Sequence, residues 1–196
     1  MNAAAQLDYR SVIVITGPSG VGKGTLVRKL KAQIPELTYS ISATTRKPRP
    51  GEQDGVDYHF LSAGQFAQKV AAKEFIEHAE YSGKDYGTLR SEVDRHLQAG
   101  APVILEIELQ GARQIRERLP EALLIFIAPP SFEALKTRLV GRGTDTSEQI
   151  AKRLKTATGE LAARDEFDVQ VVNDRLDDAM TELVRTVRDR IAGSKG

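Results

Sequence analysis

Residues 12–25 read Val-Ile-Val-Ile-Thr-Gly-Pro-Ser-Gly-Val-Gly-Lys-Gly-Thr, an apolar run that leads directly into a glycine-rich loop. The apolar run predicts a buried strand, and the residues after the loop predict a helix. A strand, a glycine-rich turn and a helix in this order direct backbone N–H groups and a helix N-terminus at one point, where a phosphate can bind. Lys23 adds a positive charge within reach of β- and γ-phosphates. The stretch therefore predicts a nucleoside triphosphate site.

The loop departs from the usual phosphate-loop pattern at one position. That pattern places a Ser or Thr hydroxyl directly after the lysine, where it binds Mg²⁺. Here Gly24 follows Lys23, and the hydroxyl comes one residue later, at Thr25. The order Gly-Lys-Gly-Thr is similar to that of nucleoside monophosphate kinases rather than GTPases. The residues expected to contact ATP in this loop are Gly17, Pro18, Ser19, Gly20, Val21, Gly22, Lys23, Gly24 and Thr25.

Composition limits the other classes of function. The chain has 196 residues, with 28 Lys and Arg against 27 Asp and Glu, and no cysteine. The balanced charge gives no reason to expect nucleic acid or a membrane as a partner, and the lack of cysteine excludes disulfides and cysteine–zinc sites. Residues 1–10 do not resemble a signal peptide, and the longest apolar run, 122–128, is too short to span a bilayer. We expect one cytoplasmic domain, either a monomer or a homo-oligomer.

Alternating strands and helices predict an α/β fold. Short runs rich in Val, Ile and Leu with little alternation are typical of buried parallel strands; they occupy 12–16, 103–107, 123–127 and 169–172. Helices are predicted at 25–33 and 132–140, at about 177–191, and from Thr146, where Thr146 and Gln149 have the spacing of a capping box. The prediction is a three-layer phosphate-loop fold with a parallel sheet at its core.

Residues 41–99 interrupt this alternation of strands and helices. They contain a basic proline-rich loop, an alternating run at 57–60, a short helical segment at 63–73 and a polar strand-like segment at 75–81. We interpret them as an inserted mixed α/β subdomain. The core of the single domain is then expected at 10–40, 100–137 and 160–192, and a helical lid at about 138–159.

The loop Thr-Thr-Arg-Lys-Pro-Arg-Pro-Gly, residues 44–51, interleaves Arg46 and Arg49 with two prolines. Proline restricts the backbone, so the loop loses less freedom when it orders. Arginine side chains grip phosphate oxygens through paired hydrogen bonds. The loop favours a second phosphate site facing the first, although a solvated basic turn is an equally good interpretation of the loop alone.

Taken together, these segments resemble the guanylate kinase family, nearly from end to end. The matching segments are GPSGVGKGT at 17–25, SATTRKPRPGEQDGVDYHF at 42–60, EFIEHAEYSGKDYGT at 74–88, LEIELQGA at 105–112, IAPPS at 127–131, RLVGRGTDT at 138–146 and VVND at 171–174. The resemblance implies transfer of a phosphoryl group from ATP to GMP, and also to dGMP, with Mg²⁺ as the cofactor. It also implies that residues 41–99 bind GMP.

The resemblance assigns the GMP contacts. Glu77 and Glu108 are expected to accept hydrogen bonds from guanine N1–H and the 2-amino group, and Ser42 and Thr88 to lie near O6 and N7. Adenine offers no such pair of donors at this edge. The acceptor phosphate is expected against Arg46, Arg49, Tyr58 and Tyr86. Glu108 stands where many family members carry Asp, and its extra methylene shifts the carboxylate by about a bond length.

The resemblance also assigns the transfer step. Lys23, Arg46, Arg138, Arg142 and Arg153 are the expected catalytic residues, because cations on the transferring phosphoryl group stabilise its transition state. Arg138 and Arg142 are also expected to bind ATP, as is Asn173, which resembles the residue that contacts adenine; a helix-cap role is the alternative for Asn173. Mg²⁺ is expected at Thr25 and, through water, at Glu106, although Glu106 can instead pair with an arginine.

Two other functions fit parts of this pattern. Some guanylate kinase-like domains have lost catalysis and bind proteins, but they usually have eroded phosphate loops, whereas Lys23 and the arginines are all present here. A related kinase that acts on another phosphorylated acceptor, such as a ribose bisphosphate, is the second alternative. The set Ser42, Glu77 and Thr88 argues against it.

Overall fold

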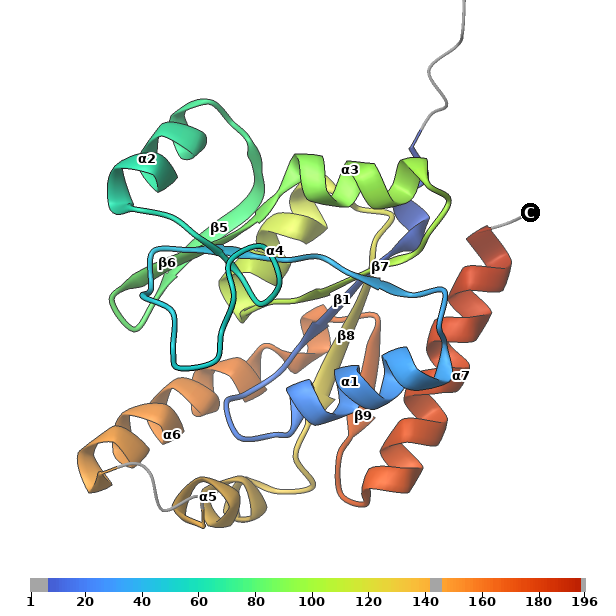
Figure 1. Cartoon of the computed structure of the whole chain (residues 1–196). Helices are drawn as coiled ribbons and strands as arrows, with labels where there is room; N and C mark the ends of the chain where they lie inside the picture. Colours follow the sequence, from blue (N-terminus) through green and yellow to red (C-terminus); the bar gives the residue numbers. More distant parts are fainter. Residues whose placement is uncertain (1–6, 142–145, 195–196) are drawn as a thin grey trace, which may run out of the picture.

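A five-stranded parallel sheet forms the centre of the molecule in the computed structural model, which describes residues 7–141 and 146–194 (Figure 1). Its strands lie in the order β2-β7-β1-β8-β9, and every neighbouring pair is parallel. Their bounds are Val12–Thr16 (β1), Thr38–Tyr39 (β2), Val103–Glu106 (β7), Leu123–Ala128 (β8) and Val169–Val172 (β9). The predicted parallel sheet is confirmed, and β2 is a short strand that the sequence did not reveal.

Helices cover both faces of this sheet, so the core has three layers (Figure 1). Ile13 and Ile15 of β1 pack in one apolar cluster, and the alternate residues Val12 and Val14 pack in another, because successive side chains of a strand point to opposite faces. The first cluster includes α1 (Lys23–Gln33), α5 (Phe132–Val140), α6 (Ser147–Ala162) and α7 (Leu176–Ser194). The second includes α3 (Arg90–Gln98) and α4 (Leu109–Arg118). Short 3₁₀ helices lie at Tyr9–Ser11 and Arg164–Glu166.

A second, mixed sheet lies beyond α4, within the residues predicted to form the insert (Figure 1). Its strands follow the order β4-β3-β6-β5, in which β3 and β4 are parallel and the other pairs are antiparallel. Their bounds are Ala43–Thr44 (β3), His59–Phe60 (β4), Phe75–Tyr81 (β5) and Lys84–Leu89 (β6), and α2 spans Ala63–Ala71. The last residues of the predicted helix 63–73 are not helical, because Lys73 adopts a left-handed φ of 57°.

The lid helix begins as the sequence predicts. Thr146 is the N-cap of α6, its hydroxyl accepts a hydrogen bond from the Gln149 backbone N–H, and the Gln149 side chain accepts one from the Thr146 backbone N–H. This is the predicted capping box. Among residues 7–141 and 146–194, no helix is long and apolar enough to cross a bilayer.

Several residues predicted to form the site lie at the carboxyl ends of the parallel strands, along one edge of the sheet. Gly17 follows β1, Glu106 ends β7, and Asn173 follows β9. Ligands bind at this edge in open α/β sheets, since the loops that follow the strands surround a crevice there.

Candidate active site

The loop after β1 has the backbone shape of an anion site. Gly17 and Gly22 adopt φ values of 145° and 101°, which favour glycine. A Cβ at Gly17 would lie 2.3 Å from the Ile127 carbonyl oxygen, so the close approach of the loop to β8 also requires glycine. Gly22 is the N-cap of α1 and offers no side-chain cap. The first N–H groups of α1 are therefore directed toward the position where a phosphate would bind.

Lys23 folds back over this loop. Its ammonium group donates hydrogen bonds to the carbonyl oxygen of Gly17 and, at 3.4 Å, to that of Pro18. The same side chain lines the cavity described below, together with Glu106. Lys23 therefore lies between the loop and the space where an acceptor would be held.

Asn173 and Arg138 support the loop from the other side. The buried Asn173 amide donates a hydrogen bond of 2.7 Å to the Val21 carbonyl oxygen. Arg138, on α5, donates one of 2.9 Å to the Asn173 carbonyl oxygen. Since α7 begins only at Leu176, the amide of Asn173 bonds to the loop rather than to a helix end. These bonds tie the start of the predicted lid to the phosphate loop.

A cavity of about 250 Å³ connects the phosphate loop with the second sheet. Seven residues predicted from the sequence line it together: Lys23, Ser42, Tyr58, Glu77, Tyr86, Glu106 and Glu108. The remaining lining residues are Tyr39, Ala79, Tyr81, Gly87, Ile107 and Gly111. Elements from both sheets thus contribute to one space.

Glu77 is the buried acid of this cavity. Its side chain belongs to β5, is 4% exposed, and accepts a hydrogen bond of 2.6 Å from the Thr88 hydroxyl on β6. Burial raises the pKa of Glu77 to about 7, while the hydrogen bonds from Thr88 and the charge of Arg118 oppose this rise. A carboxyl in this environment gains a proton near neutral pH unless a ligand supplies hydrogen-bond donors to it.

The loop 44–52 is organised around Glu52, which the sequence analysis did not select. Glu52 binds the guanidinium of Arg46 through both oxygens, at 2.8 and 2.9 Å, and accepts a 2.6 Å hydrogen bond from the Arg49 backbone N–H. Arg46 also donates to the Lys47 carbonyl oxygen at 2.8 Å. The hydrogen bonds from Arg46 and Arg49 lower the pKa of Glu52 to about 2. An acid three residues after the second arginine was the available signal for this role.

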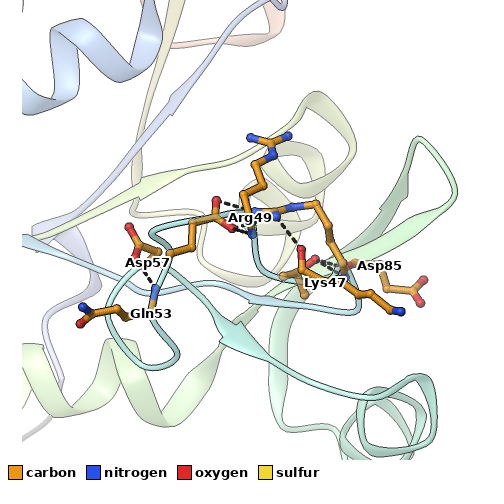
Figure 2. Close-up of polar contacts among 8 residues, drawn as sticks. Lys47, Arg49, Gln53, Asp57 and Asp85 are labelled. Carbon is orange, nitrogen blue, oxygen red and sulfur yellow. Dashed lines mark hydrogen bonds and ion pairs between the residues drawn. The ribbon is translucent and has the colours of Figure 1, made fainter.

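Arg46 and Arg49 have N–H donors that are available to an acceptor phosphate. The bonds to Glu52 and Lys47 use both Nη1–H groups and one Nη2–H of the Arg46 guanidinium. The hydroxyls of Tyr58 and Tyr86 also interact with this guanidinium, beside its Nε–H and second Nη2–H. Figure 2 shows the polar contacts of this loop, with the Arg49 side chain projecting away from it. Tyr58 lies against Arg46, with the guanidinium 5.1 Å from the ring centroid. The Tyr86 ring centroid is 6.1 Å from that of Tyr58.

Glu106, predicted near Mg²⁺, and Glu108, predicted at the guanine base, lie beside a third acid that the sequence analysis missed. Burial raises the pKa of Glu106, whereas the charge of Lys23 opposes the rise. Glu108 is the N-cap of α4 and faces Glu160 of α6, a buried acid whose pKa is raised by burial and by Glu108. No pattern in the sequence points to Glu160, because it occupies an ordinary position on a polar helix.

The predicted lid arginines are only partly placed. Arg142 lies outside the described residues. Arg153, on α6, lines a hollow that also includes Glu80, Tyr81 and Gln149. Burial raises the pKa of Tyr81, and the charge of Arg153 opposes this rise. The Arg153 side chain therefore extends from α6 toward the β5–β6 turn, on the side of the cavity where Tyr81 lies.

The oxygen atoms near the loop suit Mg²⁺ in its usual mode. Glu106 lies beside the loop, since a Cβ at Gly24 would be 3.9 Å from its Oε1 atom, and Thr25 occupies the first turn of α1. Among the described residues, no group of three or more acidic, His or Cys side chains could hold a metal by itself. Mg²⁺ commonly takes one or two protein oxygens, with nucleotide phosphates and water completing its coordination. Thr25 and Glu106 fit that donor set.

Comparison with known proteins identifies the relatives of the chain. A profile of the family described as guanylate kinase matches residues 9–190. The chain is 57% identical over 172 residues to a guanylate kinase of Trichormus variabilis, covering 88% of this chain and 86% of that protein. It is 55% identical over 177 residues to one of Bifidobacterium longum, covering 88% and 90%. The crystal structure of guanylate kinase from Anaplasma phagocytophilum matches with a TM-score of 0.73 and 30% identity, over 91% of this chain and 85% of that one.

Proposed function

Because the chain belongs to the guanylate kinase family, we propose that its phosphate loop and its cavity are the two halves of one active site. The reaction is the ATP-dependent phosphorylation of GMP to GDP. ATP and GMP are its substrates, and we place the enzyme in the cytoplasm, where both nucleotides occur. What remains to be assigned is the role of each residue.

The observation that carries this assignment is the cavity with Lys23 at the phosphate loop and the buried Glu77 on the second sheet. An ionised carboxylate can accept hydrogen bonds from guanine N1–H and the 2-amino group at once. Adenine has an unprotonated N1 and no 2-amino group, so it would leave this buried carboxylate without donors. Mispairing of this kind in a buried site can cost about 10⁴-fold in rate. Ser42, Thr88 and Glu108 are assigned to the rest of the base.

The acceptor phosphate is assigned to the loop organised by Glu52. Arg46 offers its Nε–Nη2 edge, and Arg49 supplies a second guanidinium. Burial raises the pKa of Tyr58, so its hydroxyl stays protonated and can donate to a phosphate oxygen. Tyr86 is the second hydroxyl of this set. Four donors from three segments would orient the GMP phosphate for in-line attack.

Transfer then requires positioning and charge neutralisation rather than a general base, since the attacking phosphate oxygen is already an anion. Lys23 neutralises oxygens of the transferring group, and Arg138 and Arg153 approach it when α5 and α6 close over the site. Closure excludes water that would otherwise compete with GMP. When bound, Mg²⁺ supplies further charge neutralisation at the ATP phosphates, and Thr25 and Glu106 are the residues assigned to hold it. Asn173 remains assigned to the adenine side.

A coupled assay of ADP release tests this function. ATP is supplied with GMP, dGMP, AMP, CMP or UMP as the acceptor, and kcat/KM is measured for each. We expect turnover with GMP to exceed that with AMP, CMP and UMP by several orders of magnitude. Equal turnover with all five would refute the assignment of Glu77. Absence of turnover with every acceptor, combined with binding of GMP, would instead indicate a non-catalytic module.

A further inference from the structure

Helix α4 lies directly beside strand β5, which carries Glu77 (Figure 1). Ala112 and Ile115 of α4 pack into the core of the main sheet, so this helix is fixed to the body of the protein. Gly111, Gln114 and Arg118 have the three- and four-residue spacing of one helix face, and all three contact β5. We call these three residues the α4 support.

Gln114 binds the backbone of His78, the residue after Glu77. Its side-chain amide donates a hydrogen bond of 2.7 Å to the His78 carbonyl oxygen and accepts one of 3.3 Å from the His78 N–H. β5 is the last strand of the second sheet, so backbone groups on its outer side need partners from outside the sheet. Gln114 supplies the two bonds that a neighbouring strand would otherwise make.

Arg118 binds the backbone of Ile76, the residue before Glu77. The pairing of β5 with β6 shifts here, because Phe75 lies opposite Leu89 while Glu77 lies opposite Thr88. Ile76 is therefore the extra residue of a β-bulge, and bulges change the direction of a neighbouring side chain. This shift places Glu77 opposite Thr88, whose hydroxyl bonds to it. The Arg118 guanidinium donates a hydrogen bond to the Ile76 carbonyl oxygen. A change in the register of β5 would break this bond, so Arg118 stabilises the bulge.

Gly111 leaves room for the carboxyl group itself. A Cβ at this position would lie 2.3 Å from Oε2 of Glu77, so any side chain would force the carboxyl group to move. Glycine inside a helix lowers the stability of the helix relative to alanine. The contact with Glu77 gives a reason for that cost.

We infer that the α4 support positions the Glu77 carboxylate against guanine, which makes Gly111, Gln114 and Arg118 specificity-determining positioning residues. This inference rests on the proposed role of Glu77 in reading the base. The support holds the backbone on both sides of Glu77 and bounds its carboxyl group, while the Thr88 hydroxyl bonds to one of its oxygens. Displacement of the carboxylate would weaken its bond to the guanine 2-amino group, without disturbing the phosphate loop.

The test compares GMP with inosine monophosphate, which lacks the 2-amino group, as acceptors. The variants are Gln114→Ala and its matched control Gln110→Ala, an exposed glutamine one turn earlier on α4. We expect Gln114→Ala to lower the ratio of kcat/KM for GMP to that for inosine monophosphate about tenfold, the loss expected for one well-aligned hydrogen bond to a charged group. The KM for ATP should stay at its wild-type value, and Gln110→Ala should resemble the wild type.

Gly111→Ala is the second variant, in case Gln114→Ala fails to fold, and Gly64→Ala is its control because a Cβ at Gly64 meets nothing within 4 Å. An unchanged ratio in a folded Gln114→Ala or Gly111→Ala protein would overturn the inference. So would an equal loss of rate with both acceptors, which is the effect of a merely structural role.

The variant Glu77→Gln separates this inference from the proposed function. If Glu77→Gln leaves the ratio of kcat/KM for GMP to that for inosine monophosphate unchanged, both the base-reading role of Glu77 and the inference are refuted. If Glu77→Gln abolishes the preference for GMP but the support variants do not, only the inference falls. In the Glu77→Gln background, Gln114→Ala should cause no further loss of preference, since no carboxylate remains to be positioned.

Discussion

The buried carboxyl group of Glu77 predicts that GMP binding depends on pH around neutrality. Burial raises the pKa of Glu77 to about 7 in the free protein. GMP offers two donors to this group, and only the ionised form accepts from both. GMP should therefore bind the ionised protein, and protons should compete with GMP at lower pH.

The size of the effect follows from the pKa. With a pKa of about 7, about a tenth of the free protein carries ionised Glu77 at pH 6 and about nine tenths at pH 8. The dissociation constant for GMP should thus fall about tenfold from pH 6 to pH 8, which corresponds to about 1.4 kcal/mol of binding free energy. Near pH 7, binding should release about half a proton.

Isothermal titration calorimetry measures both quantities when it is carried out in buffers with different ionisation enthalpies. Glu77→Gln is the matched variant, because glutamine has the same shape and does not titrate. The GMP phosphate has a second pKa near 6 and also contributes to the slope. This contribution, and any from Glu106 or Glu160, remains in the variant, so the difference between the two proteins reports Glu77. The reasoning is refuted if the wild type shows no pH dependence beyond that of Glu77→Gln.

Three further predictions concern other parts of the site. Lys23→Ala should lower kcat by at least about 10²-fold through loss of charge on the transferring group, while circular dichroism shows an intact fold; a wild-type rate would remove Lys23 from the mechanism. Glu52→Gln should raise the KM for GMP about tenfold, because one charge-assisted pair with Arg46 is lost, and should leave the KM for ATP unchanged; equal changes in both would contradict the role of Glu52. Because the pKa of Glu77 rises on folding from 4.5 to about 7, its neutral form contributes stability below pH 4.5 that is lost as the pH rises through 7. Urea titrations should therefore show the unfolding free energy of the wild type, relative to Glu77→Gln, falling by about 3 kcal/mol between pH 4.5 and pH 8; the same difference at both pH values would contradict this.

The sequence predicts those parts of the fold that depend on local rules. The strand 12–16, the helix 132–140 and the capping box at Thr146 and Gln149 follow from periodicity and from side-chain hydrogen bonds within a few residues. The two residues of β2 carry no period, and they form a strand because β7 pairs with them. Helices α3 and α4 were not identified, since their apolar faces are short and are interrupted by charged residues.

In the site, too, residues within local motifs were predicted, and contacts between distant segments were not. Residues within motifs, such as Lys23 and Glu77, could be selected from the sequence and the family resemblance. The groups that hold them in place could not, because their roles depend on contacts between distant segments. Gln114 lies 36 residues from His78. Asn173 was selected, but its bond to the Val21 carbonyl oxygen, 152 residues away, was not predicted. Glu52 is closer, six residues from Arg46, but nothing in the loop sequence specified a paired contact through both oxygens.

A crystal structure of the protein with GMP bound tests the central claim most directly. The account predicts that the two oxygens of Glu77 lie within hydrogen-bond distance of guanine N1 and the 2-amino group. It also predicts that the GMP phosphate lies against the Nε–Nη2 edge of Arg46 and against Arg49, facing Lys23. A guanine ring that does not contact Glu77, or a phosphate bound away from the loop 44–52, would contradict it.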